Sequence, residues 1–348
     1  MITEDQLKEI KKYLDSSENP LFFYDDDNDG LCSYLLLRKY LGKGKGICVR
    51  GKPMLSSEFL RYVKENMPDK IFVLDKPIID QDFIDNVNVP IIWIDHHTPI
   101  EREGVKYFNP RIENEKDRRN VAYWCYKVIL LENKNGSNGL WIASVGCISD
   151  WFLPEFYNDL RKKYKDLFNN EETPEDVLFK SKFGELCRII NFLLKGKVSD
   201  VNKSVRLLLR VKDPYEILNG DSKEAKYILR RIGPIKKEYE NLLKEALKFE
   251  SKEKIYFFRY RAHKYSLTSE LANELIYRFP NKIIVVGREK DNRIKMSLRS
   301  SKIDLRPVIQ KALIGVDGYG GGHEFAGAVN INVNDFDRFI ENFRRYIS

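Results

Sequence analysis

The sequence predicts an α/β protein in which a parallel-sheet domain is joined by a helical connector to a smaller α/β domain. Three observations support this prediction. Apolar runs alternate with helical stretches through the first third of the chain, long charged helical segments follow, and a second set of strand-like runs lies near the C-terminus. Alternation of strands and helices favours a parallel sheet covered on both faces. We expect the three parts to span residues 1–190, 191–250 and 251–348.

The composition is that of a globular protein with a basic balance. The chain has 348 residues, 43% of them hydrophobic and 32% charged, with a net charge of +8. This length suits two domains, and the sequence contains no apolar stretch long enough for a membrane helix. The amphipathic start "MITEDQLKEIKKYLDSS" lacks a signal-peptide core, so we expect a cytoplasmic protein. The positive charge suits a polyanionic partner but also occurs on well-solvated surfaces.

Cysteine usage argues against a disulfide-stapled or zinc-ribbon protein. The five cysteines are scattered and show no C-x-x-C spacing. Disulfide frameworks and structural zinc sites both require paired spacings. We therefore expect these cysteines to be small core residues.

Three apolar runs in the first third end in an aspartate. They are "LFFYD" ending at Asp25, "IFVLD" ending at Asp75 and "VPIIWID" ending at Asp95. The stretches "GLCSYLLLRKYLG" and "SSEFLRYVKENM" between them read as helices. Since the carboxyl ends of parallel strands share one edge of a sheet, the three side chains are expected to converge. Two buried helices, at 120–131 and 138–148, precede Asp150.

The acidic stretch "YDDDNDG" after the first run has two simpler interpretations. It opens like an EF-hand calcium loop, D-x-D-x-D-G, but the twelfth loop position is Leu36 and a strand, not a helix, precedes it. A solvated acidic turn is the other interpretation. The choice depends on which residues the fold brings near this segment.

The rest of the chain reads as helices followed by a second domain. Residues 150–250 contain the charged helical segments "FGELCRIINFLLKG", "SDVNKSVRLLLRV", "SKEAKYILRRI" and "IKKEYENLLKEALKFE". We expect the connector within this region to act as a hinge. After it, "KIYFFRYR", "KIIVVGRE" and "RIKMSLRS" read as strands and "TSELANELIYRF" as a helix. The glycine-rich stretch "GYGGGHEFAGAVNI" follows at residues 318–331.

Histidine is scarce, and three of the four histidines stand in unusual contexts. His96 and His97 follow Asp95 at a strand end, and His323 follows three glycines, whereas His263 is expected to be a surface or packing residue. Carboxylates mixed with imidazoles suit manganese or another octahedral divalent ion, while zinc prefers cysteine or a closed tetrahedral set. Two such ions, bridged by a carboxylate, would explain the tolerated repulsion among the aspartates.

These residues resemble the DHH phosphoesterase superfamily, specifically its RecJ-like branch as found in archaea, over nearly the whole chain. The first family motif, H-x-D-x-D-G-x-x-S, is similar to "DDDNDGLCS", and the second is Asp75. The third is Asp95-His96-His97, and the fourth is Asp150 in "VGCISD". The stretch "IKMSLRSSKIDL…GYGGGHEFAGAV" is similar to the DHH-associated domain. One departure is Asp25, which stands where the family has a histidine and would make the site more anionic.

The resemblance implies specific site residues. The implied catalytic residues are Asp75, Asp95, His96 and His97, and the implied metal ligands are Asp25, Asp27, Asp29, Asp75, His96, His97 and Asp150. Two Mn²⁺ ions are expected, with Mg²⁺ or Co²⁺ as alternatives. The implied substrate-binding residues are Lys295, Ser297, Arg299, Ser300, Gly320, Gly321, Gly322 and His323. Arg299 is expected to hold a phosphate in a bidentate contact. The glycines have no side chains and permit positive φ, so their backbone amides can approach a phosphate closely. Tyr319 and Phe325 are candidates for base stacking, although core packing is favoured for any single aromatic residue.

The resemblance further implies a metal-dependent exonuclease on single-stranded DNA, and on RNA as a second substrate, that releases nucleoside monophosphates through metal-activated water. Its setting would be DNA replication or repair. One alternative is a hydrolase of nano-RNA, cyclic dinucleotides or pAp. Another is a catalytically weakened replication scaffold that binds a helicase or a GINS-like factor. The implied partner is single-stranded nucleic acid, and no membrane association is expected.

Overall fold

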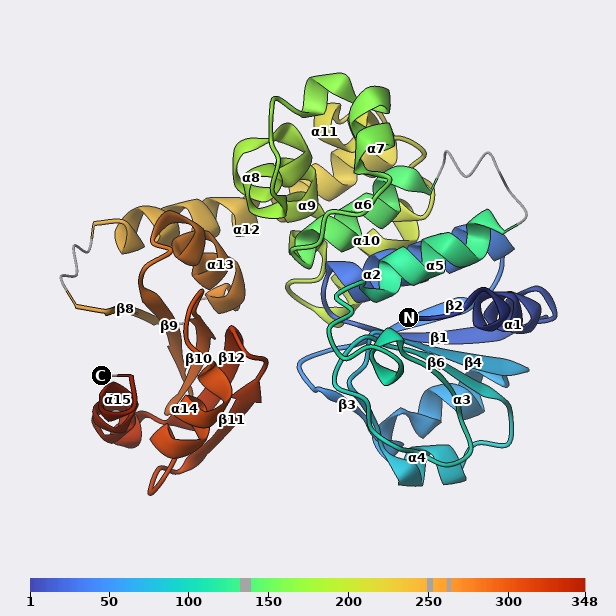
Figure 1. Cartoon of the computed structure of the whole chain (residues 1–348). Helices are drawn as coiled ribbons and strands as arrows, with labels where there is room; N and C mark the ends of the chain where they lie inside the picture. Colours follow the sequence, from blue (N-terminus) through green and yellow to red (C-terminus); the bar gives the residue numbers. More distant parts are fainter. Residues whose placement is uncertain (132–138, 249–252, 262–263, 348) are drawn as a thin grey trace. The chain divides into compact units, whose positions relative to one another are not determined.

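The computed structural model describes residues 1–131, 139–248, 253–261 and 264–347. Their contacts divide the chain into two compact units, Met1–Leu229 and Arg230–Ser348 (Figure 1). Each unit has its own sheet and its own helices, which confirms the predicted fold class. The three-part division at residues 190 and 250 stays a prediction.

The first unit is built on a five-stranded parallel sheet. Its strands, in spatial order, are β2 (Lys45–Val49), β1 (Pro20–Asp25), β4 (Lys70–Leu74), β6 (Ile91–Ile94) and β7 (Lys106–Phe108). The central strands are almost entirely buried. A parallel sheet with both faces covered requires such continuous apolar runs, which is why the sequence signal was strong. A separate parallel pair joins β3 (Met54–Leu55) and β5 (Ile78–Ile79).

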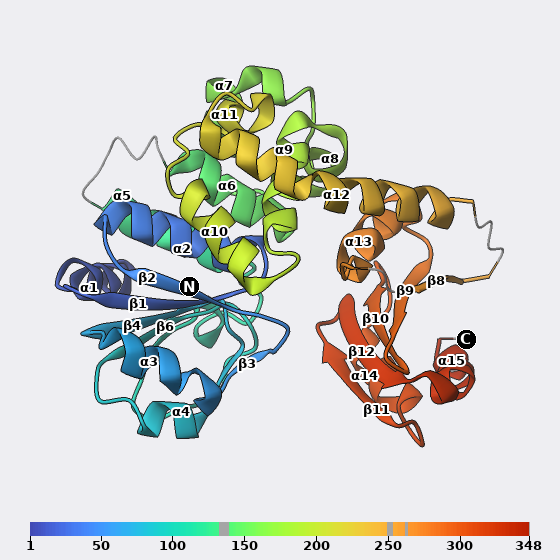
Figure 2. The same ribbon diagram turned by 180° about the vertical axis from the view of Figure 1, so that it is seen from behind.

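Helices cover both faces of this sheet, as Figures 1 and 2 show. One side carries α1 (Glu4–Asp15), α2 (Asn28–Leu41), α5 (Val121–Leu130) and α6 (Leu140–Ser149); the other carries α3 (Leu60–Asn66) and α4 (Gln81–Asp85). The first ten residues of α2 are all buried, because α5 and α6 pack over the helix. Gly146 permits this close packing: a Cβ there would lie 2.5 Å from the Cβ of Ala122.

The remainder of the first unit is helical, as predicted. It contains α7 (Tyr157–Lys163), η4 (Lys165–Leu167), α8 (Pro174–Lys180), α9 (Lys182–Leu193), α10 (Val198–Leu208) and α11 (Pro214–Asn219). Two further short 3-10 helices, η1 (Ser57–Phe59) and η2 (Pro110–Ile112), lie in the sheet region. The last two helical segments read from the sequence are one helix, α12 (Lys223–Ala246), which continues through Pro234 and spans the boundary between the units. The cysteines of this unit carry no disulfide; four are buried and Cys48 is half-buried.

The second unit is a smaller mixed sheet with helices packed on it. The strand order is β11 (Gly318–Gly322), β12 (Ala326–Asn332), β10 (Arg293–Arg299), β9 (Ile283–Lys290) and β8 (Ile255–Arg261). Only β8 and β9 are parallel; the other pairs are antiparallel. Helix α13 (Thr268–Arg278) packs on β9 and β10, and α14 (Leu305–Ala312) packs on β11 and β12. Helix α15 (Phe336–Arg345), preceded by η5 (Val333–Asp335), packs on α14.

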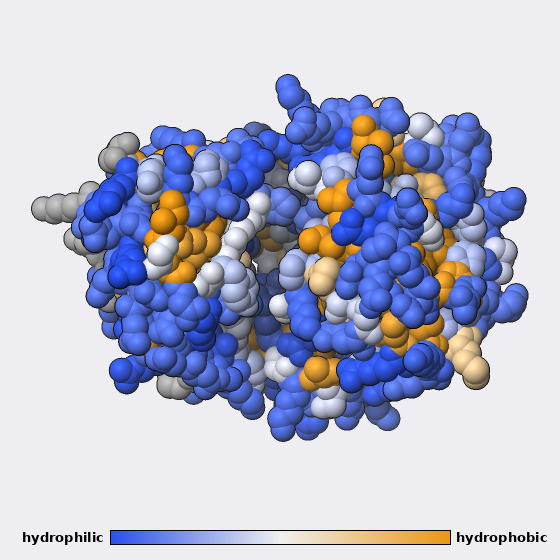
Figure 3. Space-filling model, turned by 90° about the horizontal axis from the view of Figure 1, so that it is seen from below, coloured by the Kyte–Doolittle hydropathy of each residue, from blue (hydrophilic) through white to orange (hydrophobic). Residues whose placement is uncertain are grey.

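The surface is mostly hydrophilic. In Figure 3 hydrophilic residues cover most of the face shown, and the hydrophobic residues form separate small patches. Among the described residues, helices fall short of the length and apolar character that crossing a bilayer requires.

Candidate metal centre

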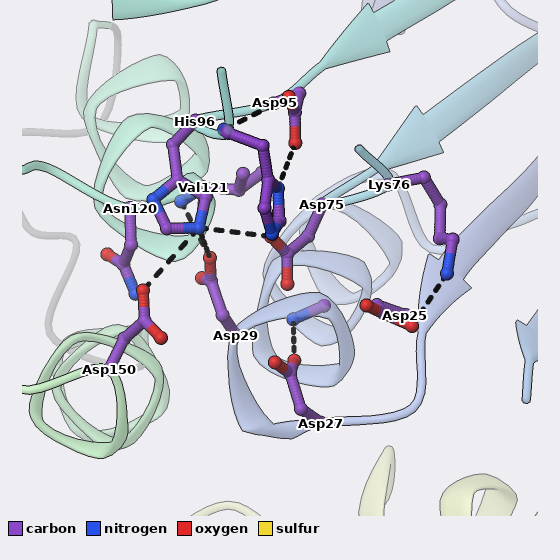
Figure 4. Close-up of polar contacts among 12 residues, drawn as sticks. Asp25, Asp27, Asp29, Asp75, Lys76, Asp95, His96, Asn120, Val121 and Asp150 are labelled. Carbon is purple, nitrogen blue, oxygen red and sulfur yellow. Dashed lines mark hydrogen bonds and ion pairs between the residues drawn. The ribbon is translucent and has the colours of Figure 1, made fainter. Parts of the chain in front are cut away.

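The strand-end aspartates meet at one edge of the parallel sheet, as the sequence predicts. Asp25 ends β1, Asp75 follows β4 and Asp95 follows β6, and these three strands are neighbours in the sheet. Asp150 reaches the same place from the C-terminal end of α6. Figure 4 shows the side chains gathered there.

The start of α2 shapes the acidic segment. Asp27 is the N-cap residue, and its Oδ1 accepts a hydrogen bond from the Gly30 N–H at 2.9 Å. Gly30 packs directly against the backbone of β1, since a Cβ at this position would lie 2.6 Å from the Asp25 nitrogen. The segment is therefore a tight strand-to-helix turn that enters a buried helix. Both the calcium-loop and the solvated-turn interpretations are excluded.

Asp29 is held by the N-terminus of a second helix. Its two carboxylate oxygens accept hydrogen bonds from the backbone N–H groups of Val121 and Ala122, at 2.9 and 2.6 Å, in the first turn of α5. Its side chain is only 1% exposed. The unpaired amides and positive dipole end of a helix stabilise such an anion.

Asp75 has strained backbone geometry. Its φ is +59°, in the left-handed region that non-glycine residues rarely adopt. Its N–H donates to the Ile94 carbonyl at 2.9 Å, which extends the β4–β6 pairing by one residue. Among the described residues the buried Asp75 Oδ1 has no hydrogen-bond partner. A carboxylate oxygen buried in this way is available as a ligand.

The two histidines have different partners. His97 Nδ1 lies 2.7 Å from Asp95 Oδ1, whereas His96 Nε2 lies 3.3 Å from Asp75 Oδ1 and 3.5 Å from Asp150 Oδ2. Burial lowers the pKa of His96. Burial opposes the charged form of His97 too, but its hydrogen bond to Asp95 raises the His97 pKa.

Asp95 acts on the site through His97. The fully buried Asp95 carboxylate also accepts from the His97 N–H at 3.1 Å and from Asn109 Nδ2 at 3.2 Å. A histidine that donates Nδ1–H to a carboxylate presents its Nε2 to a metal ion. Asp95 is therefore placed to orient a ligand, and it belongs to none of the three candidate ligand groups described below.

The electrostatics of the site favour a cation. Burial raises the pKa values of Asp27, Asp29 and Asp75, and the negative charge of neighbouring carboxylates raises them further. Among the residues that the structure describes, three groups of side chains present ligand atoms within 4.8 Å of one another: Asp75, His96 and His97; Asp29, His96 and Asp150; and Asp25, Asp27 and Asp75. Carboxylate and imidazole ligands from several elements fit divalent ions, and one of the carboxylate oxygens, Asp75 Oδ1, is buried and accepts no hydrogen bond from the described residues.

Asp25 contacts a buried lysine. Lys76 Nζ lies 2.8 Å from Asp25 Oδ1 and donates to the Lys52 carbonyl at 2.6 Å, and the Lys76 side chain is 0% exposed. Burial raises the pKa of Asp25 to about 7 against the opposing charge of Lys76. The chain thus places a fixed cation beside the aspartate that replaces the histidine of the first motif.

The implied substrate-binding residues of β10 have mixed environments. Lys295 is exposed, and Ser297 is buried, donating to Thr268 Oγ1 at 2.8 Å. Arg299 is half-buried and donates to Asn273 Oδ1 at 2.7 Å and to the Leu298 carbonyl at 2.8 Å. The buried Ser300 Oγ accepts from the N–H groups of residues 302 and 303. Ser297 and Ser300 therefore have structural partners already.

The glycine-rich segment is an edge strand, which the sequence reading missed. Gly318–Gly322 form β11, and only Gly322, with φ of +153°, departs from the negative φ of an ordinary strand. His323 is exposed, and its N–H donates to the Ala326 carbonyl at 2.7 Å.

The two aromatic candidates for stacking are on the surface. Tyr319 is 68% exposed and Phe325 36% exposed, so the preference for core packing is wrong for both. His263, expected to be a surface or packing residue, lies outside the described residues.

Sequence reasoning missed three polar residues at the candidate metal centre. Lys76 pairs with Asp25, Asn109 binds Asp95, and Asn120 caps α5 with a fully buried side chain. A lysine directly after a strand-end aspartate, in "IFVLDKP", was the one available signal for Lys76. For the two asparagines, only the fold reveals their position.

Comparisons with known proteins agree with this geometry. Two family models match the chain: the DHH family N-terminal domain over residues 21–142 and the DHHA1 domain over residues 255–348. No curated protein gives a significant match.

Several solved structures share the fold. RecJ from Thermus thermophilus in complex with Mn²⁺ superposes with a TM-score of 0.71 and 16% identity, covering 99% of this chain and 55% of that one. The present chain therefore spans about half of that RecJ. The DHH domain of a protein described as a member of a ribosomal-protein family gives 0.73 and 16%, covering 99% and 89%. CDC45 from Entamoeba histolytica gives 0.56 and 10%, covering 98% of both chains.

Proposed function

The chain belongs to the DHH phosphoesterase superfamily, and from this premise we propose that it is a divalent-metal-dependent phosphodiesterase that acts as an exonuclease on single-stranded DNA. RNA is a second proposed substrate, and nucleoside monophosphates are the proposed products. The predicted cytoplasmic location and role in replication or repair accompany this proposal.

One observation carries the proposal. Acidic and imidazole side chains from β1, α2, β4, β6 and α6 gather at one edge of the sheet, where three groups of potential ligands lie within 4.8 Å. Structural roles account poorly for this arrangement, because burying several carboxylates together is unfavourable without a cation. The buried Asp75 Oδ1, which accepts no hydrogen bond from the described residues, is an oxygen that such a cation would bind.

We propose Asp27, Asp29, Asp75, His96, His97 and Asp150 as ligands of Mn²⁺, with Asp25 as a further ligand through Oδ2. The mixture of oxygen and nitrogen ligands supports manganese, with Mg²⁺ or Co²⁺ as alternatives. The Thermus thermophilus RecJ of the same fold has been solved with Mn²⁺ and with Mg²⁺. When bound, such ions lower the pKa of a coordinated water and neutralise charge on a phosphoryl group.

The chain's own residues prepare the site for that chemistry. The N-terminus of α5 holds the Asp29 carboxylate in place, and Asp95 fixes the ring orientation of His97. Lys76 offsets the negative charge of Asp25. Rigid placement of ligands in this way reduces the reorganisation that a reaction requires.

We further propose that the second unit binds the nucleic-acid strand on one face of its sheet. The pairing register sets Lys295 opposite Asn330 and Asn330 opposite Tyr319, so these side chains share a face. Gly321 pairs with Ala328 two residues along these strands, so these two small residues lie on the same face. A cation and an exposed aromatic ring beside small residues suit the binding of a phosphate backbone and a stacked base. Arg299 and His323 remain proposed contacts at the end of this face.

The decisive test is digestion of single-stranded DNA labelled at either end. Wild-type protein with Mn²⁺ should shorten an oligonucleotide of about 30 nucleotides from one end and release monophosphates, the products expected of an exonuclease that uses metal-activated water. The labelled end that disappears first gives the polarity. Activity only on substrates of a few nucleotides would identify the nano-RNA, dinucleotide or pAp hydrolase instead. Intact DNA with Mn²⁺, Mg²⁺ and Co²⁺ alike would refute the nuclease proposal.

One observation favours a second candidate, the non-catalytic scaffold. Asp25 stands where the first motif has a histidine, and the Lys76 ammonium donates a hydrogen bond to one of the two Asp25 carboxylate oxygens. A site altered in this way could have lost an ion and serve only to bind a helicase or GINS-like factor. Calorimetry with Mn²⁺ separates the two: absence of binding together with absence of turnover supports the scaffold.

A further inference from the structure

Asn120 combines a structural role with an unused donor. It is the N-cap residue of α5, and its Oδ1 accepts a hydrogen bond from the Tyr123 N–H at 3.3 Å. Because the oxygen must face the helix to make this bond, the orientation of the side-chain amide is fixed and its NH₂ group points the other way. The side chain is fully buried, with the residue 0% exposed.

The NH₂ group of Asn120 has no partner within the described part of the chain. Buried amide donors are nearly always satisfied in folded proteins, so an exception requires an explanation. Asn120 has a hydrogen-bond acceptor role that a serine or aspartate would fill equally well. The cap therefore does not explain why the residue carries a donor.

The surroundings of Asn120 point to the metal centre. The next residue, Val121, donates its N–H to Asp29 Oδ2, and this oxygen lies 3.9 Å from His96 Nε2. His96 in turn lies 3.5 Å from Asp150. Figure 4 shows Asn120 on the same side of the centre as Asp150 and His96. Asn120 thus directly precedes the residue whose N–H binds Asp29, a member of the group of Asp29, His96 and Asp150.

We propose that Asn120 Nδ2 donates a hydrogen bond to a phosphoryl oxygen of the substrate bound at this centre, an inference that rests on the proposed phosphodiesterase function. The carboxylates around it are acceptors whose positions the fold already sets, yet none of them forms a hydrogen bond with Nδ2. The acceptor is therefore one that arrives with the ligand. An amide is also a neutral donor, so it stabilises an anionic oxygen without repelling the metal ions.

Two substitutions separate the donor from the cap. Asn120→Ser keeps an N-cap acceptor and removes the amide donor without adding charge, whereas Asn120→Ala removes both. We expect Asn120→Ser to unfold at the wild-type temperature without metal and to bind Mn²⁺ with wild-type affinity in calorimetry. Asn120→Ala should unfold at a lower temperature. If Asn120→Ser fails to fold, Asn120→Thr keeps an N-cap acceptor without adding a charge and replaces it in the binding assay.

The functional readouts address the substrate contact directly. With saturating Mn²⁺, we expect Asn120→Ser to bind deoxyadenosine monophosphate about tenfold more weakly and to lower kcat on single-stranded DNA by about 100-fold. Wild-type monophosphate affinity and turnover would overturn the inference. A loss of Mn²⁺ affinity that accounts for the whole change would also overturn it, since Asn120 would then only position a metal ligand. If the wild-type protein binds the monophosphate but cuts no DNA, the nuclease proposal fails while the monophosphate assay still decides the role of Asn120.

Discussion

Replacing Asp75 with asparagine should make the metal-free protein more stable and the proposed enzyme inactive. Asparagine has nearly the same shape as aspartate and is among the residues that best tolerate the left-handed backbone found here, with φ of +59°. The substitution therefore removes one negative charge and one potential ligand with little strain. Opposite effects on stability and activity are the signature of a charge kept for function.

The magnitude follows from the spacing of the carboxylates. Asp25, Asp27 and Asp75 present oxygens within 4.8 Å of one another, and one such pair repels by about 3.5 kcal/mol at an effective dielectric constant of about 20. Keeping Asp75 protonated instead, from its ordinary pKa near 3.8 to about pH 8, would cost about 6 kcal/mol. Repulsion between the carboxylates is the smaller of these two costs, so it determines the size of the effect. We expect Asp75→Asn to raise the free energy of unfolding of the metal-free protein by about 3 kcal/mol at about pH 8.

The pH dependence has a definite sign. A carboxyl whose pKa is raised on folding destabilises the protein as pH rises above its unfolded value, since the unfolded chain then loses protons that the folded chain keeps. Burial and the charge of Asp29 raise the pKa of Asp75 in this way. The increase in the free energy of unfolding caused by Asp75→Asn should thus be large at about pH 8 and small at about pH 5.

Urea unfolding of metal-free protein at the two pH values is the appropriate assay. Asp75→Ala is the control, because alanine removes the same charge but is disfavoured at positive φ by about 1 to 2 kcal/mol. With Mn²⁺ present the order should reverse, since only the wild type keeps the full ligand set. An Asp75→Asn protein that is less stable than wild type without metal at about pH 8 would refute the reasoning on repulsion.

Three further predictions concern neighbouring groups. Lys76→Met should lower the free energy of unfolding by about 3 kcal/mol at about pH 8, because it leaves the half-buried Asp25 without its cation. Lys52→Met, which removes a surface ion pair, should cost under about 1 kcal/mol. Equal losses in urea unfolding would contradict the buried pair. Mn²⁺ affinity measured by calorimetry should rise between about pH 6 and 8. The pKa values of Asp27, Asp29 and Asp75 are raised, so protons compete with the ion for these carboxylates. An affinity that does not change with pH would exclude these residues as ligands. Lys295→Gln should weaken single-stranded DNA binding measured by fluorescence anisotropy. It should also reduce the slope of log binding constant against log salt concentration by about 0.7, whereas Lys311→Gln, at an exposed position on α14, should leave this slope unchanged.

The sequence was most informative where local pattern and topology agree. Strands such as β1 and β4 are buried on both faces, so they appear as continuous apolar runs with an abrupt polar end. A parallel arrangement then requires Asp25 and Asp75 to share an edge. The convergence of the strand-end aspartates could be predicted for this reason, before any distance was known, whereas Asp150 comes from the end of helix α6 and was assigned to the site through the family resemblance.

Other features depend on contacts that no local pattern encodes. Lys76 reads as a surface lysine, and only tertiary contacts bury it: its ammonium meets Asp25 and the Lys52 carbonyl, while its own carbonyl accepts from Trp93 Nε1 at 2.8 Å. The strand Gly318–Gly322 contradicts the low strand preference of glycine and exists through its pairing with β12. The sequence was likewise read as two helical segments on either side of Pro234, yet α12 continues through this residue.

The three ligand groups are not independent, and their overlap indicates how two ions could be held. The group of Asp75, His96 and His97 and the group of Asp29, His96 and Asp150 both use His96. One imidazole nitrogen binds one ion, so these two groups are alternatives for a single cation position. A second ion would need the group of Asp25, Asp27 and Asp75, whose common member with the first group is Asp75. A carboxylate has two oxygens and can bridge two ions, which a histidine nitrogen cannot. Asp75 is therefore the residue on which a two-ion site depends, and Asp75→Asn should lower the Mn²⁺ stoichiometry where Asp150→Asn only weakens affinity.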